Sequence, residues 1–214
     1  MENQNILDDI YLNYVNIKVT QSNILLGDTE KIEGQFTDVV YSTDELYDLI
    51  DKRKEIIASD SKFVYGEIRR SGVETIYKEI SEYSGLDTFV DVGSGTGKIC
   101  LHMSMISNFE NIVGIEVVTG RHLYAIELQQ NLGRDFDNVV FINDDILKID
   151  FERPCVVFTN DVCFPNQLTK IIWDRLPVGS HFISFKNLGN SVKEIYLDVT
   201  WQLEPGRWYY YIKK

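Results

Sequence analysis

The chain has 214 residues, 44% of them hydrophobic, which suits one enzyme-sized domain with a packed core. Its formal net charge of −12 disfavours unaided binding to nucleic acid and fits a basic protein partner better, although acidity also serves solubility alone. No apolar run reaches membrane-spanning length, the N-terminus lacks the order of a signal peptide, and the three cysteines lack the pairing of a zinc site. We therefore expect a soluble intracellular protein, nuclear or cytoplasmic, with no metal and no membrane partner.

The first predicted unit is a small helical cap over residues 1–60. Apolar residues at helical spacing, and an amphipathic helix expected at residues 43–57, indicate this cap. A second unit follows over residues 61–214. It opens with Val64-Tyr-Gly-Glu67 and a helix expected at residues 72–83, whose apolar face should pack on a sheet.

From residue 88 onward, the pattern alternates between strands and helices, which is typical of a doubly wound parallel sheet. The strands are expected at 88–92, 111–115, 138–142, 154–159 and 179–186, and the helices at 97–107, 119–133 and 166–176. Two further β-rich runs, 195–201 and 207–212, flank Pro205-Gly206 and predict an antiparallel hairpin. This layout is the one that Rossmann-like class I methyltransferases use, so the predicted fold class is α/β of that kind.

A glycine-rich turn, with Gly93, Gly95 and Gly97, joins the strand around Asp91 to the following helix. The glycines let the backbone turn sharply and approach a ligand, and the amides at the helix start favour a carboxylate or phosphate. The spacing differs from the G-x-G-x-x-G of NAD sites, and Asp91 would repel a pyrophosphate. An acid there suits the α-ammonium and sulfonium of S-adenosylmethionine, which is the predicted cofactor.

Two more acids follow the next two strands. Glu116 comes about 25 residues after Asp91, where a carboxylate can accept from both ribose hydroxyls. Asp145 can accept from the adenine amino group, with Ile146 against the ring face; Asp144 competes with it, since only one of two adjacent side chains points inward. Acids at strand ends also cap helices. Three of them at successive strand ends nevertheless favour a cofactor site.

Asn160 follows the fourth strand, so we expect it beside the cofactor methyl group, where its amide can accept from a substrate amine. Methyl transfer mainly requires that a neutral nucleophile be aligned and water excluded. An aromatic channel would disfavour the ammonium form of a lysine by desolvation, although aromatic faces also attract cations. The candidates for this channel, each of which can instead belong to the core, are Phe158, Phe164, Trp201, Trp208 and Tyr209.

The motifs and their order resemble the non-SET histone lysine methyltransferases named for disruption of telomeric silencing. The resemblance covers about residues 60–214 and is carried by Val64-Tyr-Gly-Glu67, Phe89-Val-Asp-Val-Gly-Ser-Gly-Thr-Gly97, Gly114-Ile-Glu116, Asp145, Val157-Phe-Thr-Asn160, Ile183-Ser-Phe-Lys186 and Thr200-Trp201 with Pro205 and Tyr209-Tyr210. It implies a catalytic domain that transfers methyl groups from S-adenosylmethionine to a protein lysine.

By this resemblance, Tyr65 and Glu67 belong to a loop that closes over the methionine part of the cofactor. Glu67 has a plainer alternative role, which is to cap the helix that follows. Phe158, Asn160 and Trp201 would face the target lysine, together with an aromatic residue of the last strand.

The chain departs from the family pattern at several positions. Asp161 stands for the second asparagine of the paired motif, Lys98 for the glutamine after the glycine loop, and Ile146 for an aromatic residue. Alignment gives either Trp208 or Tyr209 as the channel tyrosine of the family.

The sequence also looks like a compact variant that lacks the lysine-rich, DNA-binding tail of the family. We therefore expect weak or no autonomous DNA binding and a basic protein substrate, with histone or nucleosome as candidates. The alternatives are a class I methyltransferase acting on a non-histone protein, an RNA or a small molecule, and a cofactor-binding module with weakened catalysis.

Overall fold

The computed structural model describes residue 6 and residues 66–83, 85–132 and 135–214. The predicted cap over residues 1–60 lies outside the described residues, apart from Ile6, and so does Tyr65. The boundary between the cap and the remaining domain therefore stays a prediction.

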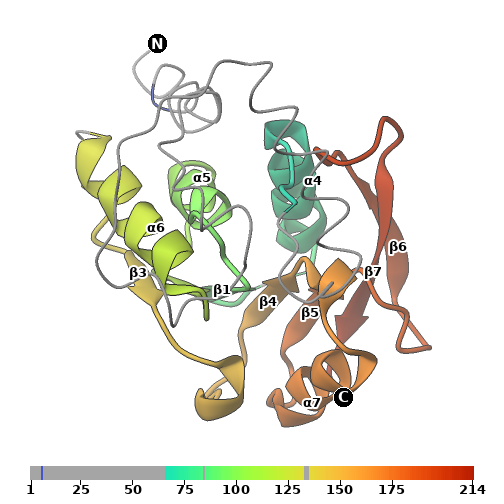
Figure 1. Ribbon diagram of the computed structural model, residues 1–214. Coiled ribbons are helices and arrows are strands. Elements are labelled where there is room, and N and C mark those ends of the chain that lie inside the picture. Colours follow the sequence, from blue (N-terminus) through green and yellow to red (C-terminus); the bar gives the residue numbers. More distant parts are fainter. Residues whose placement is uncertain (1–5, 7–65, 84, 133–134) are drawn as a thin grey trace.

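One seven-stranded sheet, in the order β3-β2-β1-β4-β5-β7-β6, forms the centre of the described protein (Figure 1). The strands are β1 (Thr88–Val92), β2 (Asn111–Ile115), β3 (Val139–Ile142), β4 (Val156–Thr159), β5 (His181–Ser184), β6 (Lys193–Leu197) and β7 (Gly206–Ile212). β1 to β5 pair in parallel, whereas β7 runs antiparallel to both of its neighbours. The predicted α/β sheet with a closing antiparallel hairpin is confirmed.

Helices cover both faces of this sheet, because the central strands are apolar on both sides. The helices are α4 (Arg70–Ser81), α5 (Lys98–Ile106), α6 (Thr119–Asn131) and α7 (Asn166–Arg175), with short 3-10 turns at Ile146–Lys148 and Asp161–Cys163. The core cluster that contains α4, α5 and α6 residues lies on one face, and a second cluster with α7 residues lies on the other. Figure 1 shows α7 separated from the other three helices by the sheet.

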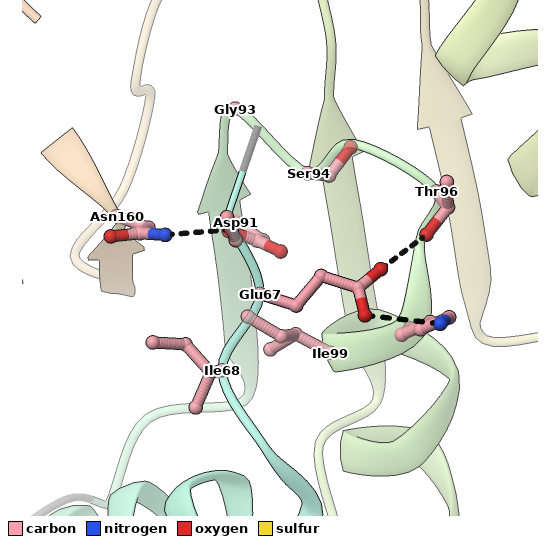
Figure 2. A pocket seen from close by; sticks show the side chains of 10 residues that line it. Glu67, Ile68, Asp91, Gly93, Ser94, Thr96, Ile99 and Asn160 are labelled. Carbon is pink, nitrogen blue, oxygen red and sulfur yellow. Dashed lines mark hydrogen bonds and ion pairs between the residues drawn. The ribbon is translucent and has the colours of Figure 1, made fainter. Parts of the chain in front are cut away.

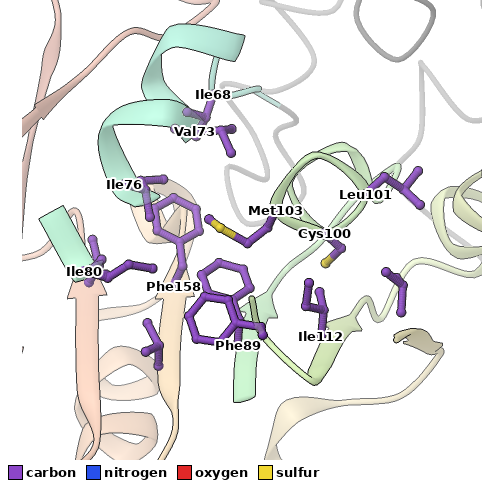
Figure 3. Packing of buried hydrophobic residues seen from close by; sticks show 14 of the residues in the cluster. Ile68, Val73, Ile76, Ile80, Phe89, Cys100, Leu101, Met103, Ile112 and Phe158 are labelled. Atoms are coloured by element: carbon purple, nitrogen blue, oxygen red, sulfur yellow. The ribbon is translucent and has the colours of Figure 1, made fainter. Parts of the chain in front are cut away.

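Phe158 is part of the first core cluster and is fully buried. Figure 3 shows its ring among Ile76 of α4, Met103 of α5 and Phe89 of β1. Its expected place in the acceptor channel is therefore wrong. Alternation along β4 directs this side chain into the layer between the sheet and the helices, where burial of a phenyl ring stabilises the fold by about 2 kcal/mol or more.

The predicted strand over residues 195–201 ends early, at Leu197. Beyond that residue the backbone pairs with the segment that leads into α4: Arg69 N donates to Asp198 O at 2.8 Å, and Thr200 N donates to Glu67 O at 3.0 Å. The hydrogen bonds that would continue the hairpin are thus directed to another part of the chain. The eight residues between β6 and β7 form a loop that carries Trp201. The other described strands and helices agree with the predicted boundaries to within two residues.

Candidate active site

A pocket opens at the carboxyl ends of β1 and β4 (Figure 2). These neighbouring strands lie where the strand order reverses, which is the position at which open α/β sheets bind their ligands. Four parts of the chain line the pocket: the segment before α4, the glycine-rich turn with the end of β1 before it, the start of α5, and the residue after β4. The lining residues are Gly66, Glu67, Ile68, Asp91, Gly93, Ser94, Thr96, Lys98, Ile99 and Asn160.

The glycine-rich turn has the sharp geometry that its sequence predicts. Gly93 and Gly97 adopt φ values of 82° and 77°, which L side chains rarely take. A Cβ atom on Gly97 would lie 2.4 Å from Cζ of Phe141, and one on Gly93 would lie 3.1 Å from Cζ of Phe164. Both backbone conformation and packing therefore require glycine here, and Phe164 lies against the turn.

Asp91 carries the most perturbed carboxyl group of the pocket. Asp91 is 1% exposed, and its Oδ2 atom has no hydrogen-bond partner among the described residues. Burial, followed by the nearby charge of Glu116, raises its pKa from 3.8 to about 8. A buried carboxylate without donors is costly, so the position fits a cationic ligand that donates hydrogen bonds.

Glu116 is buried and braces the glycine-rich turn. Its Oε2 accepts from Gly95 N and its Oε1 from Val118 N, both at 2.8 Å. These bonds fix the carboxylate at the end of β2, beside Asp91 on the neighbouring strand. Its expected contact with the ribose stays a prediction.

The two candidates for the adenine contact have different partners. Asp144 accepts from the Lys148 ammonium at 2.7 Å, and this hydrogen bond lowers the pKa of its carboxyl. Asp145 Oδ1 accepts from Leu147 N at 2.9 Å and so caps the 3-10 turn that follows. The pairing of Asp144 with a surface lysine favours Asp145 for the cofactor, and Ile146 is buried in the second core cluster.

Glu67 points into the pocket and does not cap α4. The N-cap residue of α4 is Arg69, and no side chain caps that helix. The Glu67 carboxylate instead accepts from Thr96 Oγ1 at 3.4 Å and forms an ion pair of 3.1 Å with the Lys98 ammonium (Figure 2). The segment before α4 is thereby joined to the start of α5.

Asn160 is held by the same segment. Its Nδ2 donates to Gly66 O at 3.0 Å, whereas its Oδ1 is buried and has no partner among the described residues. The amide is therefore oriented by one end and presents an acceptor at the other. A Cβ atom on Gly66 would lie 2.5 Å from Cε3 of Trp201, so the Trp201 ring packs directly on this backbone.

Trp208 and Tyr209, the two channel candidates on strand β7, point to opposite faces of the sheet. Trp208 belongs to the first core cluster, and its ring centroid lies 6.2 Å from that of Trp201 and 5.2 Å from that of Phe185. Tyr209 belongs to the second cluster, on the α7 face. Because side chains alternate along a strand, Tyr209 cannot share the face of Trp201. Tyr209 therefore lies on the opposite face of the sheet from the Trp201 ring, whereas Trp208 packs near that ring but is fully buried in the first core cluster.

Asp161, which departs from the family pattern, is completely buried behind Asn160. Its carboxylate accepts from Thr169 Oγ1 at 2.6 Å, Ser184 Oγ at 2.8 Å and Phe185 N at 2.7 Å. Burial raises its pKa, and these three hydrogen bonds oppose that shift. The network ties the end of β4 to α7 and β5, and so fixes the backbone that carries Asn160.

Six residues of the pocket lining were not assigned to the site from the sequence: Gly66, Ile68, Ser94, Thr96, Lys98 and Ile99. Gly66 and Ser94 stand inside quoted motifs, and only packing reveals their contacts. Lys98 is the first residue of α5 after the glycine-rich turn, a position at which a side chain can reach a ligand on that turn, and this signal was available.

The pocket fits the predicted cofactor. Three buried atoms of its lining can accept hydrogen bonds and have no partner among the described residues: Asp91 Oδ2, Ser94 Oγ and Asn160 Oδ1. An ammonium group offers three donors and a positive charge, which matches this set. Asp91, Ser94 and Asn160 would therefore hold the amino-acid end of S-adenosylmethionine.

Solved structures define the class of protein to which this fold belongs. An RNA methyltransferase from Salinibacter ruber, in complex with S-adenosyl-L-homocysteine, has a TM-score of 0.53 and 20% identity over 68% of this chain and 92% of its own. Trm5 of Methanocaldococcus jannaschii, in complex with adenosine, has a TM-score of 0.51 and 12% identity over 71% of this chain and 52% of its own. The fold is that of a class I methyltransferase.

The family model described as histone methylation protein DOT1 matches residues 52–202. The match spans more than half of the chain, so the protein belongs to this family, as the resemblance implied. Membership makes it a methyltransferase that uses S-adenosylmethionine, and both of those predictions are confirmed. No curated protein sequence matches the chain.

Within the described residues, no group of three or more His, Cys, Asp or Glu side chains could hold a metal ion. The described helices include none of the length and apolar character needed to cross a membrane.

Proposed function

We propose that this protein is a protein-lysine N-methyltransferase that acts on a basic protein, with histone or nucleosome as the first candidate. The observation that carries the proposal is the buried, unpartnered Asn160 Oδ1 of the pocket lining, on an amide that is bonded to the Gly66 backbone beneath the Trp201 ring. An unpartnered amide oxygen there is suited to accept from the N–H of a lysine amine.

The aromatic residues beside Asn160 support an amine as acceptor. Trp201 covers Gly66, whose carbonyl oxygen receives the Asn160 amide, and Trp208 and Phe185 continue the ring cluster behind it. Trp201 remains 39% exposed, so an incoming chain can reach its ring. Such rings remove water from an alkyl amine, which lowers the free energy needed to deprotonate it.

The chain's own residues then have separate tasks. Asp91 and Ser94 hold the ammonium of the cofactor, and Asn160 orients the acceptor amine towards the reactive centre. When bound, S-adenosylmethionine supplies a methyl group on a sulfonium, which a neutral amine takes by in-line displacement. No side chain has to form a covalent intermediate.

The choice of a basic protein over nucleic acid rests on charge. The net charge of −12 favours a lysine-rich partner and opposes a polyanion. We propose that the protein alone binds duplex DNA weakly or not at all. Strong, salt-sensitive binding in a titration with free duplex DNA would contradict this part of the proposal.

Methyl transfer from radiolabelled S-adenosylmethionine tests the proposed acceptor. Core histones, nucleosomes and a cell lysate are offered to the wild-type protein, and the labelled atom is identified by mass spectrometry. We expect label on a lysine side chain of a basic protein. Label confined to RNA, to a small molecule or to another amino-acid type would overturn the lysine assignment.

A further inference from the structure

Lys98 brings a positive charge into a pocket whose other ionisable side chains, among the described lining residues, are acidic. The residue is only 5% exposed, and burial lowers its pKa, while the charge of Glu67 opposes that shift. Removing an ammonium from water costs several kcal/mol unless anions or acceptors replace the water. Glu67 supplies one such anion at 3.1 Å, and an anionic group of a ligand in the pocket that Lys98 lines would supply another.

The pocket accordingly offers both signs of charge. The acceptors Asp91 Oδ2, Ser94 Oγ and Asn160 Oδ1 suit an ammonium, and the Lys98 ammonium suits an anion. α5 begins at Lys98, and no side chain caps its first amides, so the positive end of this nine-residue helix adds to the attraction for an anion. A ligand that carries an ammonium and a carboxylate on one carbon atom matches this arrangement.

We propose that Lys98 binds the carboxylate of the cofactor's amino-acid end and that Glu67 is the counter-ion it shares with that carboxylate. The ion pair holds Lys98 in place at 3.1 Å from Glu67 Oε2, with both side chains at least nine-tenths buried. Affinity for the cofactor then depends on its carboxylate as well as on its ammonium. This inference rests on the proposed use of the pocket for the cofactor.

Calorimetry with two ligands distinguishes the contribution of the cofactor's carboxylate from that of its ammonium. S-adenosylhomocysteine carries both groups, and its decarboxylated analogue keeps the ammonium and lacks the carboxylate. We expect the wild-type protein to prefer S-adenosylhomocysteine by about 10- to 100-fold, the usual effect of a hydrogen bond between charged groups. Lys98→Met should remove this preference, with the affinity for the analogue changed by about twofold at most.

Loss of Lys98 alone leaves the Glu67 carboxylate buried beside a methionine, which can destabilise the fold. The double variant Glu67→Gln, Lys98→Met carries no charge at either position and is measured alongside it, with Lys170→Met as a lysine control outside the pocket. The double variant should also bind both ligands with similar affinity.

The inference is overturned if the two Lys98 variants keep the preference for S-adenosylhomocysteine, or weaken both ligands equally. If the wild-type protein binds neither ligand, the pocket is not the cofactor site, and the proposed function fails with it. These outcomes are distinct, because the first concerns the variants and the second the wild-type protein.

Discussion

Binding of S-adenosylhomocysteine should release a proton from Asp91. With a pKa of about 8, the carboxyl of the ligand-free protein is about 90% protonated at pH 7. Contact with the ligand ammonium favours the ionised form, so about 0.9 proton leaves for each ligand bound. Because rising pH ionises the carboxyl before binding, affinity should be roughly 50-fold higher at pH 8 than at pH 6.

Calorimetry at pH 7, in buffers with different ionisation enthalpies, measures the number of protons released. The matched variant is Asp91→Asn, which has no titratable group and should bind weakly, with no proton release from this position. A wild-type value near zero, or the same release from the variant, would refute the assignment of the ammonium to Asp91.

Three further predictions concern the same strand ends. Asn160→Ala should lower the affinity for S-adenosylhomocysteine by about tenfold at most, because Asp91 and Ser94 still hold the ammonium, and should lose about 100-fold or more in single-turnover methyl transfer at saturating cofactor, because acceptor alignment is removed; normal turnover would mean that the acceptor site lies elsewhere. Asp161→Ala should lower the free energy of unfolding in urea by about 3 kcal/mol or more, because three buried donors lose their acceptor. Asp161→Asn should lose less, and equal losses would contradict the hydrogen-bond argument. In the ligand-free protein, the raised pKa of Asp91 makes the free energy of unfolding depend on pH. The stabilisation from the protonated carboxyl is complete below about pH 4 and is lost as the pH rises to about 8, by up to about 1.4 kcal/mol per pH unit. Asp91→Asn should flatten this pH dependence, and an unchanged dependence would contradict the raised pKa of Asp91.

The parallel part of the fold could be predicted from the sequence because its signals are local. Each strand from β1 to β5 is a short apolar run bounded by turn residues, and each intervening helix has its own period. Asp91 and the glycine-rich turn are likewise contiguous, so their proximity needs no tertiary information.

The residue at which strand β6 ends could not be predicted, because the hydrogen-bond partners of the residues after it come from a distant segment of the chain. Residues 198–200 have the composition of a strand, yet they pair with residues 67–69, more than 100 positions earlier. The same pairing brings Trp201 onto Gly66. No local pattern contains that contact.

The choice between Trp208 and Tyr209 shows a related difficulty. Both residues stand in one apolar run, and only the register of β7 against β5 and β6 decides which of them faces α4. Phe158 was misplaced for the same reason, since a strand buried on both faces gives no signal that distinguishes core from pocket.

A crystal structure of the complex with S-adenosylhomocysteine tests most directly the claim that this pocket binds the cofactor's amino-acid end. The account predicts the ligand ammonium within hydrogen-bond distance of Asp91 Oδ2, at the carboxyl ends of β1 and β4. An amino-acid end turned away from Asp91, or a ligand bound elsewhere on the protein, would contradict it.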